Sequence, residues 1–270
     1  MKMISIFLMT TLALVACKKD TAMQYDPNVK SEITLEFDNV AGDKELQLNT
    51  GSYTNASGQT FNVSLLQYFI SNISLTTADG RVYTVPQLES YFLVKEQDVA
   101  SQKIKLMVPE GEYTSVSFMI GVDSLRSTRP IGERPGVLDP ANYPAGHEGM
   151  YWSWNAGYIF YKMEGTSAAA PADPTGNRKF RFHIGLFGGM TAPTINNIKM
   201  NTIELTANGT AKVKTGRKPV VHFLHDILKT MGGTTNVDLA ANSTVMVSPF
   251  SANIANNYVK AFAHEHTHNE

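Results

Sequence analysis

The sequence predicts an all-β fold, namely a β-sandwich with long loops and one or two short helices. Three observations lead to this prediction. Apolar and polar residues alternate with a period of two, turn residues separate the alternating segments, and long helical periodicity is scarce. Many short strands punctuated by Gly, Pro and Asn are typical of a sandwich.

The alternation places the expected strands. Ile33, Leu35 and Phe37 alternate with polar residues, and residues 60–85 read as two strands around a turn at residues 78–81. Further strands are expected at residues 91–94, 104–108 and 116–122.

Two segments are helix candidates, and two are expected loops. Residues 222–231 end at a glycine pair, as helices often do, whereas residues 64–70 are ambiguous. Residues 123–149 and 164–177 are rich in Pro, Gly or Ala and predict long loops, which are often functional or disordered.

The first residues have the pattern of an export signal. Lys2 precedes a short apolar run, and LVAC at residues 14–17 resembles the lipobox of bacterial lipoproteins. We therefore expect a signal peptide over residues 1–16, a lipid anchor at Cys17 and a flexible tether over residues 17–30. Residues 31–270 are expected to form a single domain, held at the cell envelope and most naturally at the outer membrane.

Composition limits the chemistry. The 270 residues carry 23 Lys and Arg against 24 Asp and Glu, a net charge of −1 with no basic stripe, which argues against a nucleic-acid partner. Cys17 is the only cysteine. If it carries lipid, a metal site in the domain must use nitrogen, oxygen or thioether donors rather than thiolate.

Two central segments carry candidate residues. GMYWSWNAGYIFYKMEG at residues 149–165 contains both tryptophans, Trp152 and Trp154, with aromatic side chains on both faces if it is extended. Such residues are more often core than part of a cofactor site. In a strand, His183 lies opposite the apolar face of Phe180 and Phe182, so it is either a site residue or a solvated histidine.

The remaining histidines are candidate metal ligands, because imidazole suits copper and zinc. His264, His266 and His268 alternate in the tail and share one face if it is extended; a disordered tail is the alternative. His222 and His225 have a spacing that suits one helix face, and a packing role fits them equally well.

Acidic residues and His147 surround the aromatic block. His147 is an additional candidate ligand, and Asp123 and Glu164 are among the acids that could ligate a metal or orient a histidine. The sequence contains no hydrolase elbow, phosphate-binding loop or His-Glu-x-x-His motif, so no enzymatic activity is expected.

Several motifs in order resemble the MbnP-like copper-binding family. They are SNISL at residues 71–75, GVDSL at residues 121–125, LDP at residues 138–140, the aromatic block, FHIG at residues 182–185 and the terminal acid-His-x-His. The resemblance covers most of the domain, and the aromatic block is its most specific part.

This resemblance implies one copper ion bound by histidines beside a tryptophan that is oxidised to kynurenine, an oxidation carried out by a di-haem peroxidase-like partner. The matching ligands are His183, His266 and His268, and Trp152 or Trp154 matches the modified residue. The expected function is copper acquisition, storage or delivery. The alternative is a sandwich lipoprotein that binds a protein or glycan partner and uses its histidines structurally.

Overall fold

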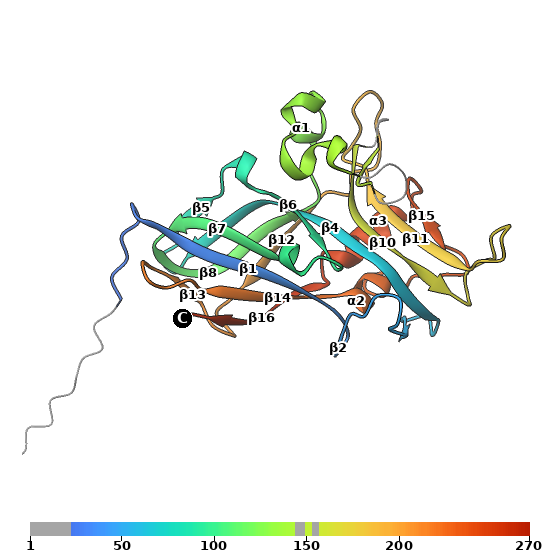
Figure 1. The fold of residues 1–270 in the computed structure, drawn as a ribbon, viewed down its shortest axis with the longest axis horizontal. Helices are drawn as coiled ribbons and strands as arrows, with labels where there is room; N and C mark the ends of the chain where they lie inside the picture. The colour runs from blue at the N-terminus through green and yellow to red at the C-terminus, as the bar shows by residue number, and fades with distance from the viewer. Residues whose placement is uncertain (1–22, 144–148, 153–156) are drawn as a thin grey trace, which may run out of the picture.

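The fold is a sandwich of two sheets. A computed structural model describes residues 23–143, 149–152 and 157–270. Within these ranges the strands form a five-stranded and an eleven-stranded sheet, which we call sheets A and B. Figure 1 shows them as an elongated body from which α1 and its flanking loops protrude on one side. The all-β sandwich expected from the sequence is confirmed.

Short helices and turns connect the strands. The strands are β1 (Lys30–Ala41), β2 (Lys44–Glu45), β3 (Tyr53–Thr54), β4 (Thr60–Thr77), β5 (Val82–Thr84), β6 (Tyr91–Lys95), β7 (Lys103–Pro109), β8 (Gly111–Ile120), β9 (Tyr151–Trp152), β10 (Gly157–Ser167), β11 (Lys179–Gly185), β12 (Lys199–Glu204), β13 (Ala211–Val213), β14 (Val220–Asp226), β15 (Thr244–Val245) and β16 (Phe262–His268). The helices are α1 (Ser124–Ser127), α2 (Ile227–Met231), α3 (Ser251–Tyr258) and the 3-10 turns η1 (Gln87–Glu89), η2 (Val99–Gln102), η3 (Ile131–Glu133), η4 (Gly136–Leu138) and η5 (Pro140–Asn142).

Sheet A has β1 near its centre. It runs β16-β14-β1-β2, with β7 also paired to β1. The β1–β14 pair is parallel, and the β14–β16 and β1–β7 pairs are antiparallel. Alternate residues of β1 and β14 are buried, so one face of the sheet packs on the core and the other faces outward.

Sheet B covers the inner face of sheet A. Its main path is β12-β8-β4-β10-β11-β15. The ring of Phe118 on β8 lies 5.5 Å from Phe37 of β1 and 5.5 Å from Phe262 of β16, edge to face in both cases. These aromatic contacts join the two sheets, because buried aromatic rings contribute large apolar area and favour edge-to-face packing.

A second, smaller core lies under the loop that contains α1. Phe69 of β4 and Tyr158 and Phe160 of β10 are fully buried there with Leu138 of the loop. The central strands of sheet B are therefore covered on both faces, as the aromatic residues on both sides of the block predict. No helix within the described ranges is both long and apolar enough to cross a membrane.

Most expected strands and the turn at residues 78–81 are confirmed, and four details are corrected. Residues 64–70 lie within β4. Residues 222–231 begin as a strand and become helical only at Ile227, because residues 220–226 pair on both sides with β1 and β16. The second expected loop starts after Ser167, the end of β10. The aromatic block is two strands, since β9 pairs antiparallel with β10.

A buried polar network explains His225. The Oδ1 atom of Asn39 accepts hydrogen bonds from Tyr68 Oη at 3.0 Å and from His225 Nδ1 at 2.8 Å. The other His225 nitrogen, Nε2, lies 3.4 Å from Thr230 Oγ1, which can donate to it. Both ring nitrogens are thus occupied inside the core, so the packing role weighed for His225 is the one that the structure shows.

We predict that His225 stays neutral far into the acidic range. Burial lowers its pKa from 6.5 to about 3, because an imidazolium there would lose its hydration. Below about pH 6.5 the unfolded chain binds a proton that the folded chain excludes, so this histidine makes the free energy of unfolding fall as the pH falls. Histidine-selective NMR should show no His225 titration between about pH 7 and pH 4. A midpoint near 6.5 would contradict the buried position.

Candidate metal centre

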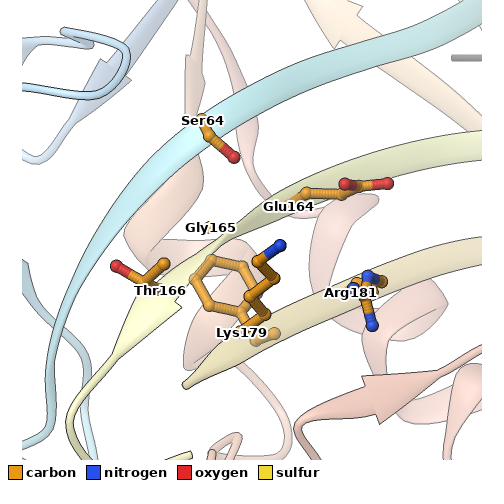
Figure 2. A pocket seen from close by; sticks show the side chains of 7 residues that line it. Ser64, Glu164, Gly165, Thr166, Lys179 and Arg181 are labelled. Carbon is orange, nitrogen blue, oxygen red and sulfur yellow. The ribbon is translucent and has the colours of Figure 1, made fainter. Parts of the chain in front are cut away.

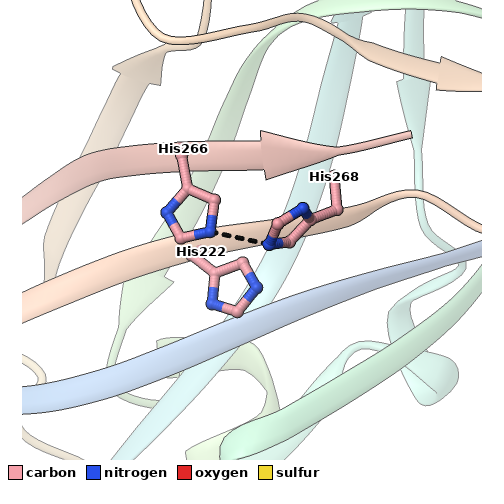
Figure 3. A group of neighbouring side chains, drawn as sticks. All are labelled: His222, His266 and His268. Carbon is pink, nitrogen blue, oxygen red and sulfur yellow. Dashed lines mark hydrogen bonds between the residues drawn. The ribbon is translucent and has the colours of Figure 1, made fainter. Parts of the chain in front are cut away.

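Three histidines meet on the outer face of sheet A. His222 of β14 and His266 and His268 of β16 each offer a ring nitrogen, and these nitrogens lie within 4.8 Å of one another. Figure 3 shows the three rings converging, with His266 Nε2 and His268 Nε2 2.9 Å apart. The rings of His222 and His266 are nearly parallel, with centroids 4.3 Å apart. We call this group the histidine triad.

Strand register explains the triad. His222 is directly opposite His266 in the β14–β16 pair, so their side chains project from the same face. His268 lies two residues further along β16 and shares that face because the side-chain period of a strand is two. The three imidazoles are therefore positioned by two paired strands, β14 and β16, and not by a loop.

A bulge removes His264 from this face. The register shifts between His222 and Phe223, and His264 stands opposite Phe223, a core residue. His264 Nε2 lies 2.9 Å from Thr267 Oγ1, and burial lowers the pKa of its imidazole. The expectation that all three tail histidines share one face is thus corrected to His266 and His268.

Two carboxylates border the triad. Glu36 of β1 is directly opposite His222, and Asp38 lies two residues further along the same strand. Glu36, Asp38 and His222 form a second group whose donor atoms lie within 4.8 Å of one another. His222 Nδ1 is 3.3 Å from Asp38 Oδ2, and Glu36 Oε1 is 2.9 Å from Lys103 Nζ on β7.

The donor set of the triad fits copper. Imidazole nitrogens bind copper and zinc, and metal–nitrogen bonds are about 2 Å long, so nitrogens that already lie within 4.8 Å of one another need only small side-chain adjustments to share an ion. His222 and His266 are partly buried and His268 is exposed, which leaves the site open to an ion from solution. No thiolate is needed for this coordination.

His183 lies elsewhere, on β11 of sheet B. It is 6% exposed, and its Nε2 atom lies 2.7 Å from Glu164 Oε1. Its neighbour across the β10–β11 pair is Lys162, whose buried Nζ is 3.8 Å from the same oxygen. With Trp152, His183 lines a cavity of about 220 Å³. The structure therefore brings His222, and not His183, together with the tail pair of the expected set His183, His266 and His268.

Glu164 also borders a polar hollow on its other side. Figure 2 shows this hollow of about 210 Å³ on the outer face of β10 and β11, with Arg181, Lys179 and Thr166 around it. Burial alone would raise the pKa of Glu164, but the hydrogen bond and charge of His183 and the nearby Lys162 and Arg181 outweigh it and lower that pKa. Glu164 thus orients His183, which is one of the two roles expected for the acids near the aromatic block.

The other expected site residues have separate positions. Asp123 caps α1 by accepting the Arg126 backbone N–H, and it also accepts the Tyr91 hydroxyl, so it anchors the loop. Cys17, His147 and Trp154 lie outside the described residues. The tail is extended, as one of the two alternatives for it predicts. It pairs with β14, however, and not with β9, the strand that contains Trp152.

The sequence offers His222 as a possible ligand only together with His225 on one helix face, outside the expected set of His183, His266 and His268. Residues 220–226 read VVHFLHD, in which Val221 and Phe223 alternate with His222 and Leu224. A period of two would have indicated a strand with His222 and His225 on opposite faces. The glycine pair after residue 231 favoured a helix over the whole segment instead.

The fold and the site together define a β-sandwich protein with a surface cluster of imidazoles. Residues 30–247 match the MbnP family, and the chain belongs to this family. The family is associated with methanobactin and copper, which supports a copper-related role at that coarse level. The matched segment contains His183 and His222 and ends before β16.

Among solved structures, MbnP from Methylosinus trichosporium is similar in fold. The TM-score is 0.52 at 16% sequence identity, and the alignment covers 82% of each chain. Identity at this level supports the fold alone. No curated protein matches the sequence.

We predict that the Glu164→Gln variant is less stable by about 1–3 kcal/mol, because it removes a charged partner from buried His183 and Lys162. Urea denaturation measures the change. The matched control is Glu133→Gln, which removes an exposed ion pair with Arg129 and should change stability by less than about 1 kcal/mol. Equal effects of the two substitutions would contradict the structural importance of the Glu164–His183 pair.

Proposed function

We propose that this protein is an exported, lipid-anchored copper-binding protein that holds one copper ion at His222, His266 and His268 for acquisition, storage or delivery. The observation that carries the proposal is the convergence of three imidazoles within 4.8 Å. Membership of a copper-associated family supports copper over zinc, which the same donors also suit.

The anchoring part of the proposal depends on Cys17. The lipobox-like LVAC and the short apolar run before it support cleavage and lipidation at this residue. The domain would then be held at the outer membrane through its lipid. Intact mass of the exported protein, compared with a Cys17→Ser variant, tests the anchor, and an unprocessed wild-type chain would contradict it.

A tryptophan modification is the second part of the proposal. The resemblance to the family supports oxidation of Trp152 or Trp154 to kynurenine by a di-haem peroxidase-like partner. Trp152 lies beside His183 at the cavity on sheet B, away from the histidine triad. Peptide mass mapping of the exported protein reads the modification directly, and two unmodified tryptophans would exclude it.

We predict that the purified protein binds one equivalent of copper and that the His266→Ala/His268→Ala double variant loses this binding. The double variant lacks two of the three imidazole ligands. Its copper affinity should therefore fall by more than the roughly 10–100-fold that is typical when only a residue hydrogen-bonded to a ligand is lost. His222→Ala should have the same direction of effect. Equilibrium dialysis with metal analysis measures stoichiometry and affinity.

The matched control for copper binding is His183→Ala, since His183 lies on the other sheet. This variant should keep full stoichiometry and an affinity close to that of the wild type. If copper binding survives in the double variant and is lost in His183→Ala, the ion belongs to the site beside Trp152 and the triad assignment fails. If the wild-type chain binds no copper, the partner-binding lipoprotein with structural histidines becomes the better reading.

A further inference from the structure

A pocket on the lobe around α1 lies outside the copper proposal. We propose that this pocket binds a small amphipathic oxyanion, meaning a carboxylate or phosphate group on an apolar body, and that Arg126 holds the charged group. The pocket shares no residue with the histidine triad or with the cavity beside Trp152. The proposal therefore does not depend on copper binding.

The pocket lies where η1 meets the segment that contains α1 and η3. In Figure 1, α1 and its flanking turns project from the sandwich. The volume of the pocket is about 430 Å³, within the roughly 300–1,000 Å³ of typical small-molecule sites. It is lined by Leu88, Arg126, Arg129, Gly132, Glu133 and Pro135. Apolar and charged side chains both line it, which suits an amphipathic ligand.

Arg126 is fixed in the pocket wall and keeps an unused donor. It is 8% exposed, and its Nη1 atom donates to the backbone carbonyl of Glu133 at 2.7 Å. Its Nε atom is buried and has no hydrogen-bond partner among the described residues. Buried donors are normally paired, and a guanidinium offers five N–H groups in a planar fork that matches carboxylate and phosphate. The unused donor of this fixed guanidinium therefore marks a place for a ligand oxygen.

Within the described ranges, the chain supplies no ion-pair partner to the Arg126 guanidinium. Glu133 is paired with Arg129 instead, with 3.6 Å between Oε2 and Nη1. Asp123 accepts the backbone N–H of Arg126 and the hydroxyl of Tyr91, so its oxygens anchor the loop. A nearly buried cation without a partner is unfavourable, and a bound anion would compensate its charge.

A second buried arginine fixes the backbone behind the pocket. Arg134 is 3% exposed, and its Nη2 and Nε atoms donate to the carbonyls of Ser127 and Arg129, each at 2.8 Å. Its guanidinium also lies over the rings of Tyr151 and Tyr158, 5.2 and 5.6 Å from their centroids. These contacts hold the turn after α1 in one conformation, so the pocket is preformed and binding does not have to order it.

Exposed apolar side chains accompany the charged group on the same lobe. Leu88 lines the pocket and is 61% exposed. Leu125 of α1 and Ile131 of η3 are also exposed. Exposed apolar residues gathered in one place and rimmed by polar residues are typical of a binding surface. An apolar body on the ligand would shield such side chains from water, whereas inorganic phosphate would not.

Matched probes test the pocket and distinguish the two sources of the oxyanion. Octanoate carries a carboxylate and mono-octyl phosphate carries a phosphate on the same alkyl chain, while octanol lacks the charge. Isothermal titration calorimetry of the purified protein should show one or both anions binding with 1:1 stoichiometry, and octanol binding at least about tenfold more weakly. The anion that binds more tightly identifies the charged group that the pocket prefers.

Two variants test the assignment of the site. Arg126→Gln removes the charge and should weaken anion binding by about 10–100-fold, because hydrogen bonds to charged groups are the stronger kind. Gly132→Leu leaves the arginine in place and fills the pocket, so it should abolish binding. The fold tolerates this side chain, since a Cβ at Gly132 meets nothing within 4 Å. The matched control is Arg81→Gln, at an exposed arginine paired with Asp79, which should keep wild-type affinity.

The outcomes decide the proposal in either direction. Absence of binding by both anions would overturn it, and so would octanol binding as tightly as the anions, because the charge would then play no part. Unchanged affinity in Gly132→Leu or Arg126→Gln, or an equal loss in Arg81→Gln, would place the ligand elsewhere. If Arg126→Gln does not fold, the Arg126 Nε–H resonance of the wild type takes its place: the bound anion should shift this signal, and an unshifted signal would contradict the proposal.

Discussion

The parallel pairing of β1 with β14 is the constraint on which both the fold and the site depend. It runs from Thr34–Val220 to Val40–Asp226 and joins segments almost 190 residues apart in the sequence. On the inner face the pair brings Phe37 next to Phe223, with ring centroids 5.3 Å apart. On the outer face it brings the carboxylates of β1 next to His222. One register thus serves the core and the candidate metal centre at the same time.

The two sheets carry different histidine chemistry. Sheet A exposes the triad beside carboxylates, where an ion can arrive from solution. Sheet B buries His183 with Glu164 and Lys162 beside Trp152, and there the charged groups satisfy one another. The separation explains why histidines that look equivalent in the sequence have unlike roles.

Residue type and local spacing predicted part of the site. His266 and His268 share a face because they are two apart, and that relation holds in β16. His264 follows the same spacing but leaves the face, because a bulge shifts the register next to it. The glycine pair after residue 231 favours a helix at His222, whereas pairing with two neighbouring strands keeps this residue extended. Tertiary pairing overrode a local signal in both cases.

The sequence by itself determined the class of the fold, the face on which most strand residues project and the absence of thiolate ligands from the domain if Cys17 carries lipid. These follow from composition and from a side-chain period of two, which are local properties. Only the tertiary structure decided that β16 lies beside β14 and not beside the strand of Trp152. Strand order depends on contacts between residues far apart in the chain. The alternation of apolar and polar residues in a strand is the same whichever strand pairs with it, so it cannot select the neighbour. For that reason the third imidazole, His222, and the carboxylates beside it emerged from the fold alone.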